Sequence, residues 1–218
     1  MERLTLKEVN FPGKLIVFEG TDGAGKTTMI SKLWEFLSNK YGVNNVLTIK
    51  QPTDMSRKTK LFQKMMYSQN HDDIDYRAVQ LLTMSDRIQH IHEVIEPALK
   101  EGKYIVCDRY VYTSYVNMLA RDYKNEVWFK DVAKHIIKPD VVFLAYVKPS
   151  LAIKRIKSRA EEKDRFLDEK LLINVSNNFK ELAELENFKV LDTSRNPKES
   201  FDEVLKTLEE VGVINEIQ

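Results

Sequence analysis

The sequence has few of the features that mark secreted, membrane-spanning or nucleic-acid-binding proteins. Its 218 residues include one cysteine, Cys107, which excludes an intrachain disulfide framework and favours a reducing compartment. Its longest apolar runs, such as 141–147, fall far short of the roughly 20 residues of a membrane-spanning helix. Residues 1–10 have no signal-peptide core. With 34 basic and 33 acidic residues, the net charge of +1 argues against a general nucleic-acid-binding surface. We expect a cytoplasmic globular protein without a membrane or nucleic-acid partner.

Glycine and proline are also scarce, at 7 and 6 residues, so the places where they occur divide the chain into elements. No repeat or flexible linker suggests a boundary, and we expect one domain over residues 1–218. Short apolar runs predict five strands, at 14–19, 46–49, 104–107, 140–147 and 188–191. Helical spacing predicts helices at 25–40, 76–100, 131–137, 149–159, 168–186 and 197–211. Pro97 should disturb the last turn of the long second helix. The alternation predicts an α/β fold, a five-stranded parallel sheet with helices on both faces.

A phosphate-binding loop directly follows the first predicted strand. Residues 20–28 match the pattern G-x-x-x-x-G-K-[ST] between a strand and a helix. In such loops backbone N–H groups converge on phosphate oxygens, and the next helix presents its positive end. Lys26 adds charge toward the β- and γ-phosphates, and the Thr27 hydroxyl can bind Mg²⁺. The predicted nucleotide-binding residues are Gly20, Thr21, Asp22, Gly23, Ala24, Gly25, Lys26, Thr27 and Thr28.

A second acidic residue for the metal is expected from a neighbouring strand. Asp108 follows the third predicted strand and is itself followed by Arg109. A carboxylate in this place could instead cap the next helix. Because ligands of parallel sheets bind at the carboxyl ends of the strands, the position favours a role in the site.

An arginine-rich segment follows the fourth predicted strand. Arg155 and Arg159 stand four residues apart on one helical face, and Arg165 lies beyond them. The segment predicts a lid over about 155–168 that brings cations to a transferring phosphate. The alternative is a solvated helix face with ion pairs. Residues 148–150 read Lys-Pro-Ser rather than the guanine-reading N-K-x-D, which excludes a regulatory GTPase.

Taken together, these motifs resemble the thymidylate (dTMP) kinase family of P-loop nucleoside monophosphate kinases, from residue 14 to about 211. The matching segments are 18–28, 50–52, 85–90, 93–102, 108–110, 138–140 and the arginines of the lid. The resemblance implies a three-layer P-loop NTPase fold with an Arg-rich lid, and ATP and Mg²⁺ as cofactors. It implies phosphorylation of a pyrimidine deoxynucleoside monophosphate to the diphosphate, with dTMP as the favoured acceptor. Homodimers are common in this family, which makes the apolar face of the long helix a candidate interface.

The resemblance also implies roles for single residues. Arg109 would clamp the acceptor phosphate and Arg87 would hydrogen-bond the acceptor base. Lys50 stands where the family usually has the Arg of an R-E-P motif, so it lacks the bidentate fork. Since Gly23 is neutral, the chain resembles the subtype in which the lid supplies the catalytic cations.

The implied catalytic residues are Lys26, Asp22, Arg109, Arg155, Arg159 and Arg165. The implied acceptor-binding residues are Asp22, Lys50, Thr83, Arg87, Arg109 and Tyr110, and the metal residues are Thr27 and Asp108.

The chain departs from the family pattern at the acceptor base. Thr83 stands where the family usually has a phenylalanine that stacks on thymine, and residues 52–55 and 116–119 also differ. Tyr110, Tyr112 and Tyr115 are candidates for a replacement ring, and the alternative for this aromatic-rich segment is a helix-packing face. Two alternatives stay open on the sequence alone. One is a related kinase for another nucleoside monophosphate or a nucleoside, and the other is a catalytically weak nucleotide-binding regulatory protein.

Overall fold

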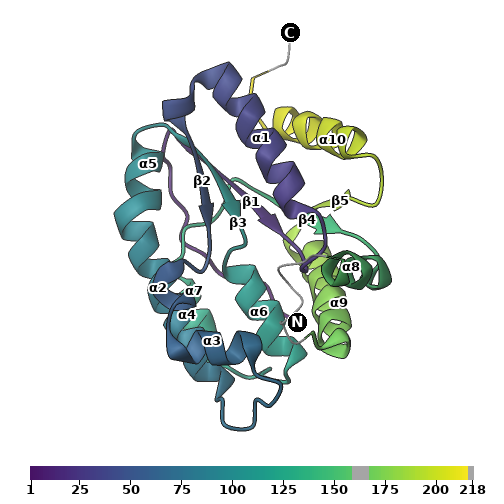
Figure 1. The fold of residues 1–218 in the computed structure, drawn as a ribbon. Coiled ribbons are helices and arrows are strands. Elements are labelled where there is room, and N and C mark those ends of the chain that lie inside the picture. The colour runs from purple at the N-terminus through teal and green to yellow at the C-terminus, as the bar shows by residue number, and fades with distance from the viewer. Residues whose placement is uncertain (159–166, 216–218) are drawn as a thin grey trace.

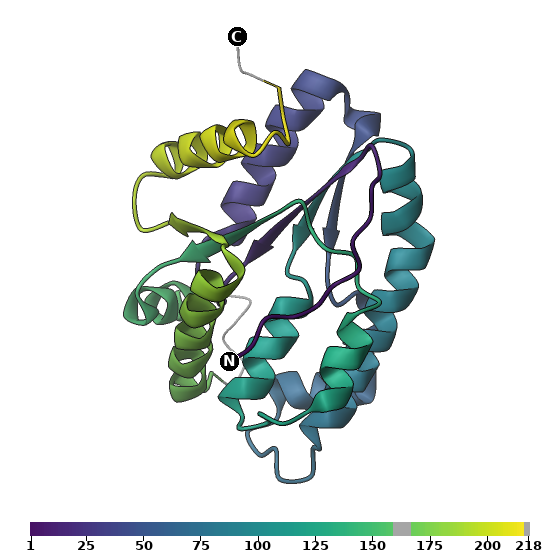
Figure 2. The same ribbon diagram turned by 180° about the vertical axis from the view of Figure 1, so that it is seen from behind.

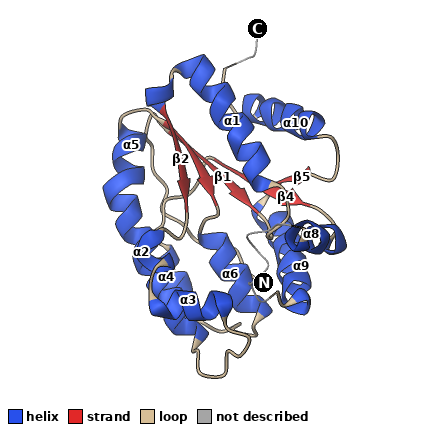
Figure 3. Cartoon of the chain, viewed as in Figure 1, coloured by secondary structure: helices blue, strands red, loops and turns tan. Residues whose placement is uncertain are grey.

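The computed structural model describes residues 1–158 and 167–215, and its centre is a parallel sheet (Figures 1 and 3). The strand order is β2-β3-β1-β4-β5. The strands are β1 (Lys14–Glu19), β2 (Val46–Lys50), β3 (Tyr104–Asp108), β4 (Val141–Tyr146) and β5 (Lys189–Asp192). The predicted α/β class and five-stranded parallel sheet are confirmed. β1 is central, and its Phe18 pairs with Asp108 of β3. The phosphate loop after β1 and the Asp108 carboxylate therefore lie at the same edge of the sheet.

Helices cover both faces of the sheet (Figures 1 and 2). Side chains alternate along β1, so Ile16 and Phe18 enter one core cluster while Leu15 and Val17 enter the other. The first cluster packs under α1 (Lys26–Tyr41) and α10 (Pro197–Glu210). The second packs under the helices α4 (Tyr76–His90), α5 (Glu96–Lys100), α6 (Val111–Ala120), α7 (Val127–Ala133) and α9 (Glu169–Glu186). Shorter elements are η1 (Val43–Asn45), α2 (Asp54–Arg57), α3 (Lys60–Tyr67) and α8 (Pro149–Lys157).

The long second helix is a composite. A π-helical segment, η2 (Ile91–Ile95), joins α4 to α5. Pro97, at the start of α5, has no backbone N–H to continue the α-helical ladder, which accounts for irregular hydrogen bonding just before it. The predicted disturbance therefore lies before the proline rather than in the last turn.

Three helices were not predicted, namely α2, α3 and α6. The first two have ordinary local caps, because the side chains of Thr53 and Thr59 accept from Met55 N and Phe62 N. In α6 the N-cap residue, Tyr110, offers no side-chain cap. Its first turn is capped by a residue from another strand, described below. The predicted helix at 131–137 was also misplaced, since α7 runs over Val127–Ala133.

The first thirteen residues form an ordered arm along the back of the molecule (Figure 2). Leu4 and Leu6 are buried. Leu4 N donates to Glu186 Oε1 at 2.7 Å, and Lys7 pairs with Ile137 in an isolated bridge. The arm therefore ties α9 to the end of the α7 region. No helix in residues 1–158 and 167–215 is long and apolar enough to cross a membrane.

Candidate functional site

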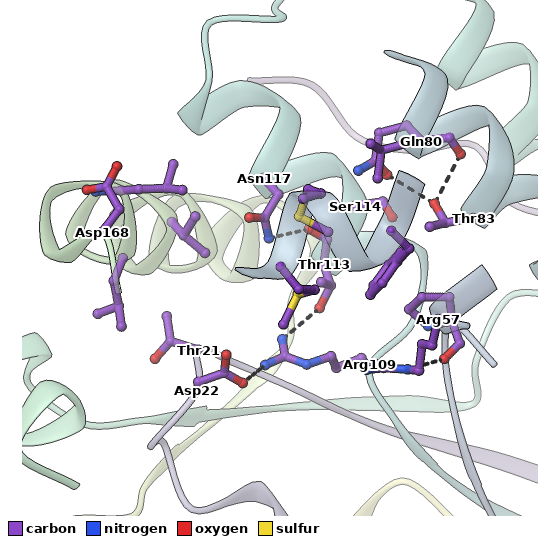
Figure 4. Close-up of a pocket in the computed structure, with 18 of the residues that line it drawn as sticks. Thr21, Asp22, Arg57, Gln80, Thr83, Arg109, Thr113, Ser114, Asn117 and Asp168 are labelled. Atoms are coloured by element: carbon purple, nitrogen blue, oxygen red, sulfur yellow. Dashed lines mark hydrogen bonds and ion pairs between the residues drawn. The ribbon is translucent and has the colours of Figure 1, made fainter. Parts of the chain in front are cut away.

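A cavity of about 440 Å³ opens at the carboxyl ends of β1 and β3 (Figure 4). The phosphate loop forms one end, with Thr21 and Asp22 in its wall. Residues of α3, α4, α6 and α9 form the remaining walls. The cavity therefore lies where the sheet topology predicts a ligand.

Glycines shape the phosphate loop. Gly25, the N-cap of α1, has a φ of 88°, a left-handed conformation that an L side chain rarely adopts. Gly23 has a φ of 76°, and a Cβ there would lie 2.4 Å from the backbone oxygen of Ala152 in α8. A side chain at this position would therefore displace α8, so the loop cannot carry its own arginine without rearrangement.

Lys26 lies folded within this loop. Its ammonium donates to the backbone oxygens of Gly20 and Thr21, both at 2.9 Å, and the residue is 7% exposed. Burial, and next the charge of Arg109, lowers the pKa of Lys26 to about 8. A buried ammonium held by carbonyl oxygens is poised to exchange them for phosphate oxygens.

This low pKa predicts that ATP binding weakens above pH 8. The free protein then loses the Lys26 proton and must regain it to bind phosphate, so the dissociation constant should rise by up to about tenfold per pH unit. Calorimetric ATP titrations across this pH range measure the dissociation constant, and Lys26→Met is expected to show no such pH dependence.

The stability of the nucleotide-free protein should instead increase with pH over the same range. Between about pH 8 and the ordinary value of 10.5 the unfolded chain binds more protons, so stability contributed by this group rises with pH.

Arg109 reaches from the end of β3 across to the phosphate loop. Its Nη2 donates to Asp22 Oδ1 at 2.5 Å and its Nη1 to the Gly20 oxygen at 2.9 Å. Burial alone would lower the pKa of Arg109, but neighbouring carboxylates, Asp22 first, raise it. The backbone φ of Arg109 is 66°, a strained value for a non-glycine residue. The guanidinium is therefore held beside the loop at a conformational cost.

Glu19 fixes the turn that carries Arg109. Its Oε1 accepts from Tyr110 N at 2.9 Å and Thr113 N at 3.0 Å, and its Oε2 accepts from Thr113 Oγ1 at 2.5 Å. Burial raises the pKa of Glu19, and these hydrogen bonds oppose the rise. The carboxylate caps α6 from β1, and this long-range cap is why no local sequence signal marks the start of α6.

A second arginine, not predicted from the sequence, faces the same space. Arg57 at the end of α2 donates from Nε to the Pro52 oxygen at 2.7 Å. Its guanidinium lies 5.6 Å from the ring centroid of Phe62. Burial, followed by the charge of Arg109, lowers the pKa of Arg57. Both arginines line the cavity. Lys50 also lines the cavity but is 56% exposed. Sequence offered no signal for Arg57 beyond its basic charge soon after Pro52.

The far end of the cavity is polar and largely buried. Arg87 is fully buried; its Nη1 and Nη2 donate to the oxygens of Thr83 and Tyr110, each at 3.1 Å. Its Nε has no hydrogen-bond partner among the described residues. Thr83 lines this end too, together with Gln80 and Ser114 (Figure 4). The predicted acceptor residues Thr83 and Arg87 thus lie together, away from the phosphate loop.

None of the three candidate tyrosines replaces the family phenylalanine in the cavity, and the packing alternative holds for this segment. Tyr110, Tyr112 and Tyr115 are all described, and none lines the cavity. Tyr110 is fully buried and its hydroxyl donates to the Ile137 oxygen at 2.8 Å, so its predicted contact with the acceptor is not possible in this arrangement. Tyr112 and Tyr115 pack in the core. The rings that line the cavity are Phe62, Tyr67 and Tyr76, from α3 and the first turn of α4.

Asp108 provides a fitting ligand for a divalent cation. Its Oδ1 is buried and has no hydrogen-bond partner among the described residues, while its Oδ2 lies 3.9 Å from Lys50 Nζ. A buried, unsatisfied carboxylate oxygen needs a cation or water to offset its desolvation. Asp108 and Thr27 both line the cavity, and hard oxygen ligands of this kind suit Mg²⁺.

One predicted lid arginine contacts the phosphate loop. Arg155 on α8 donates from Nη1 to the Gly23 oxygen at 3.3 Å and from Nη2 to the Thr193 oxygen at 3.1 Å. Thr193 in turn donates to the Ala24 oxygen at 2.5 Å, so the loop after β5 also supports the phosphate loop. Arg159 and Arg165 lie outside the described residues. The lid at about 155–168 and the roles of its arginines stay predictions.

Comparisons with known proteins agree with this geometry. A family model described as thymidylate kinase matches residues 18–204. The chain is 32% identical over 204 residues to the thymidylate kinase of Ligilactobacillus salivarius (strain UCC118), covering 90% of this chain and 97% of that one. It is 31% identical over 202 residues to that of Brachyspira hyodysenteriae (strain ATCC 49526 / WA1), covering 93% and 96%. Its fold resembles a crystal structure of thymidylate kinase from Ehrlichia chaffeensis, with a TM-score of 0.65 at 23% identity, covering 90% and 98%.

Proposed function

The chain belongs to the thymidylate kinase family, and we propose how this phosphotransferase uses its cavity to phosphorylate dTMP with ATP, a step of nucleotide biosynthesis. The observation that carries the proposal is one continuous cavity. It joins a phosphate loop at one end to a buried polar pocket at the other, with Arg57 and Arg109 between them (Figure 4). This layout suits two ligands whose phosphates meet in the middle.

The phosphate loop binds the ATP side. The backbone N–H groups of residues 20–28 surround the β-phosphate, and Lys26 reaches the β- and γ-oxygens. Arg155 already touches the loop and supplies a further cation where Gly23 cannot. The transferring group carries charge on its equatorial oxygens, so these fixed cations stabilise the transition state.

The acceptor monophosphate lies beyond the loop. Arg109 and Arg57 clamp its phosphate, with Lys50 at the exposed rim, and Asp22 holds the Arg109 fork in place. The base occupies the end lined by Phe62, Thr83 and Arg87, and Arg87 is proposed to hydrogen-bond it. The acceptor oxygen then faces the γ-phosphorus for in-line displacement, and no covalent enzyme intermediate is needed.

Mg²⁺ is proposed as the metal cofactor of this reaction. Thr27 and Asp108 would hold it, directly or through water. When bound, the ion would neutralise part of the phosphate charge. The buried, unpartnered Asp108 Oδ1 supports this assignment.

A coupled assay of ADP release tests the proposal with each nucleoside monophosphate as acceptor. We expect turnover with dTMP that depends on Mg²⁺ and is abolished by EDTA. Turnover of no monophosphate at all would overturn the kinase assignment. Preference for a purine monophosphate or a nucleoside would overturn the acceptor assignment alone.

The oligomeric state and location complete the proposal. Leu81 and Ile88 stand seven residues apart on α4 and are 53% and 39% exposed. Apolar side chains at this spacing form one face that suits a homodimer. Sedimentation equilibrium measures this, and a monomer at micromolar concentration would contradict it. The single domain over residues 1–218 and the cytoplasmic location stay predictions.

A further inference from the structure

Asp86 is a buried acidic residue on α4 to which the reaction described so far assigns no role. It is 1% exposed and lies directly before Arg87. Unlike Arg87, it is not one of the residues that line the cavity, and its carboxylate contacts the start of α2 instead. A buried carboxylate is costly unless it is hydrogen-bonded, so its partners indicate what it stabilises.

Three donors of the α2 segment meet this carboxylate. Oδ2 accepts from Thr53 N at 2.7 Å and from Ser56 N at 3.3 Å, and Oδ1 accepts from the Thr53 hydroxyl at 2.7 Å. Two of these donors are backbone N–H groups, which can only donate, so the direction of their bonds is fixed. The Ser56 hydroxyl also donates to the Leu82 oxygen of α4 at 3.2 Å. α2 is therefore fastened to α4 mainly through Asp86.

The turn that Asp86 holds also carries Arg57. α2 contains only four residues, and an isolated helix of this length is not stable in water. Its closing hydrogen bond runs from Arg57 N to the Thr53 oxygen at 3.0 Å. Thr53 thus donates to Asp86 and accepts from Arg57, so the carboxylate and the arginine lie at the two ends of a single turn. Loss of the carboxylate should release that turn from α4.

The Arg57 guanidinium reaches the cavity from this turn (Figure 4). Its Nε donates to the Pro52 oxygen at 2.7 Å, and its Cζ lies 5.6 Å from the ring centroid of Phe62. Both contacts lie within residues 52–62, so they orient the side chain relative to its own segment. Where the guanidinium lies in the cavity depends in addition on how the turn between them is held, and Asp86 holds it.

We propose that Asp86 is a positioning residue for Arg57: it fastens α2 to α4 so that the guanidinium meets the acceptor phosphate already oriented. The inference rests on the proposed function, in which Arg57 and Arg109 bind that phosphate. A preorganised cation binds more tightly than a mobile one, because less conformational entropy is lost on binding. Since Asp86 and Arg87 are consecutive, one turn of α4 would serve both the phosphate and the base of the acceptor.

A double-mutant cycle tests this coupling. Its members are Asp86→Ala, which removes all three acceptor contacts, Arg57→Ala, and the double variant. Asp86→Asn is the conservative variant, because its oxygen can still accept from the backbone N–H groups while its amide faces the Thr53 hydroxyl. Thr53→Ala breaks one of the same bonds from the α2 side. Glu93→Ala is the matched control, an exposed acid further along the same long helix.

The measurements separate phosphate binding from base binding. They are calorimetric dissociation constants for dTMP and for thymidine, which lacks the phosphate, together with kcat/KM for dTMP and the KM for ATP. Thermal melting shows whether each variant is folded.

Asp86→Ala should raise the dissociation constant for dTMP by about five- to tenfold, close to the effect of Arg57→Ala, and that for thymidine by less than about twofold. The value of kcat/KM for dTMP should fall by the same factor as dTMP affinity, with the KM for ATP unchanged. In the Arg57→Ala background, Asp86→Ala should add less than about twofold, because the group that it positions is gone. Asp86→Asn should retain most of the affinity, Thr53→Ala should weaken dTMP binding by about threefold, and Glu93→Ala should match the wild type.

Equal weakening of dTMP and thymidine binding would overturn the proposal, since it indicates general damage to the cavity. Independent, multiplying effects of Asp86→Ala and Arg57→Ala would overturn it too, as would unchanged dTMP binding by either variant. If Asp86→Ala does not fold, Thr53→Ala decides, and an unchanged dissociation constant for dTMP would count against the proposal. The proposed function fails separately, by absence of turnover with every monophosphate, and the dissociation constants then still decide whether Asp86 acts through Arg57.

Discussion

Replacing Lys26 with alanine is expected to reduce kcat by about 10³-fold or more while leaving the fold intact. The ammonium is the only cation described within the phosphate loop itself, residues 20–28, and it is held within reach of the β- and γ-phosphates. Its present partners are two loop carbonyls, one of which, the Gly20 oxygen, also accepts from Arg109. That carbonyl keeps a partner in the variant, so the loop should survive the loss. Single-turnover phosphoryl transfer at saturating ATP measures the effect.

Lys32→Ala provides the matched control. Lys32 lies on the same helix, α1, and its ammonium stands 5.8 Å from the Phe201 ring centroid, away from the cavity. Its kcat should equal that of the wild type. Activity of Lys26→Ala within about tenfold of the wild type would show that other groups stabilise the transferring charge.

Replacing Arg109 with alanine should lower kcat/KM for dTMP by about 10²–10³-fold, with the KM for ATP changed less than about threefold. The guanidinium is 13% exposed and fixed by Asp22 and the Gly20 oxygen, so a phosphate meets it already oriented. Such preorganised, charge-assisted hydrogen bonds are among the strongest that a side chain makes. Arg109→Lys should restore little, because an ammonium lacks the planar fork.

The neighbouring cations provide an internal comparison for this prediction. Arg57→Ala should reduce kcat/KM for dTMP by about tenfold, since Arg57 is partly buried against Phe62. Lys50→Ala should cost less than about threefold, because the side chain is 56% exposed and its charge is screened by water. If Arg109→Ala raises the KM for ATP as much as that for dTMP, the residue supports the phosphate loop rather than the acceptor.

The sequence was sufficient to predict those parts of the site that are formed by residues close together in the chain. The phosphate loop could be read directly because its backbone conformation, its lysine and its threonine come from nine consecutive residues. Asp108 and Arg109 follow a buried strand, and the parallel sheet places that strand end beside the loop. Arg155 was predicted as a lid arginine from the basic segment after the fourth strand, and the structure brings it to Gly23 of the loop.

Residues that act through distant partners could not be found in this way. The start of α6 depends on Glu19, which precedes Tyr110 by 91 residues, so the sequence alone did not decide whether Tyr112 and Tyr115 line the cavity or, as found, pack in the core. The rings that line the cavity come from α3 and the first turn of α4, and Arg57 reaches the cavity from the end of α2. Neither short helix was predicted.

The sequence by itself determined the chemistry, namely a phosphate loop, a strand-end carboxylate and a paired arginine in a parallel α/β sheet. Each of these features is formed by residues that are close together in the sequence, so local backbone conformation is enough to build it. Tertiary packing alone decided which residues line the far end of the cavity, where we propose that the acceptor binds. The cavity wall there combines residues of α3, α4 and α6. Burial gives the polar contacts of this wall their specificity, because inside the protein an unpaired polar group is costly.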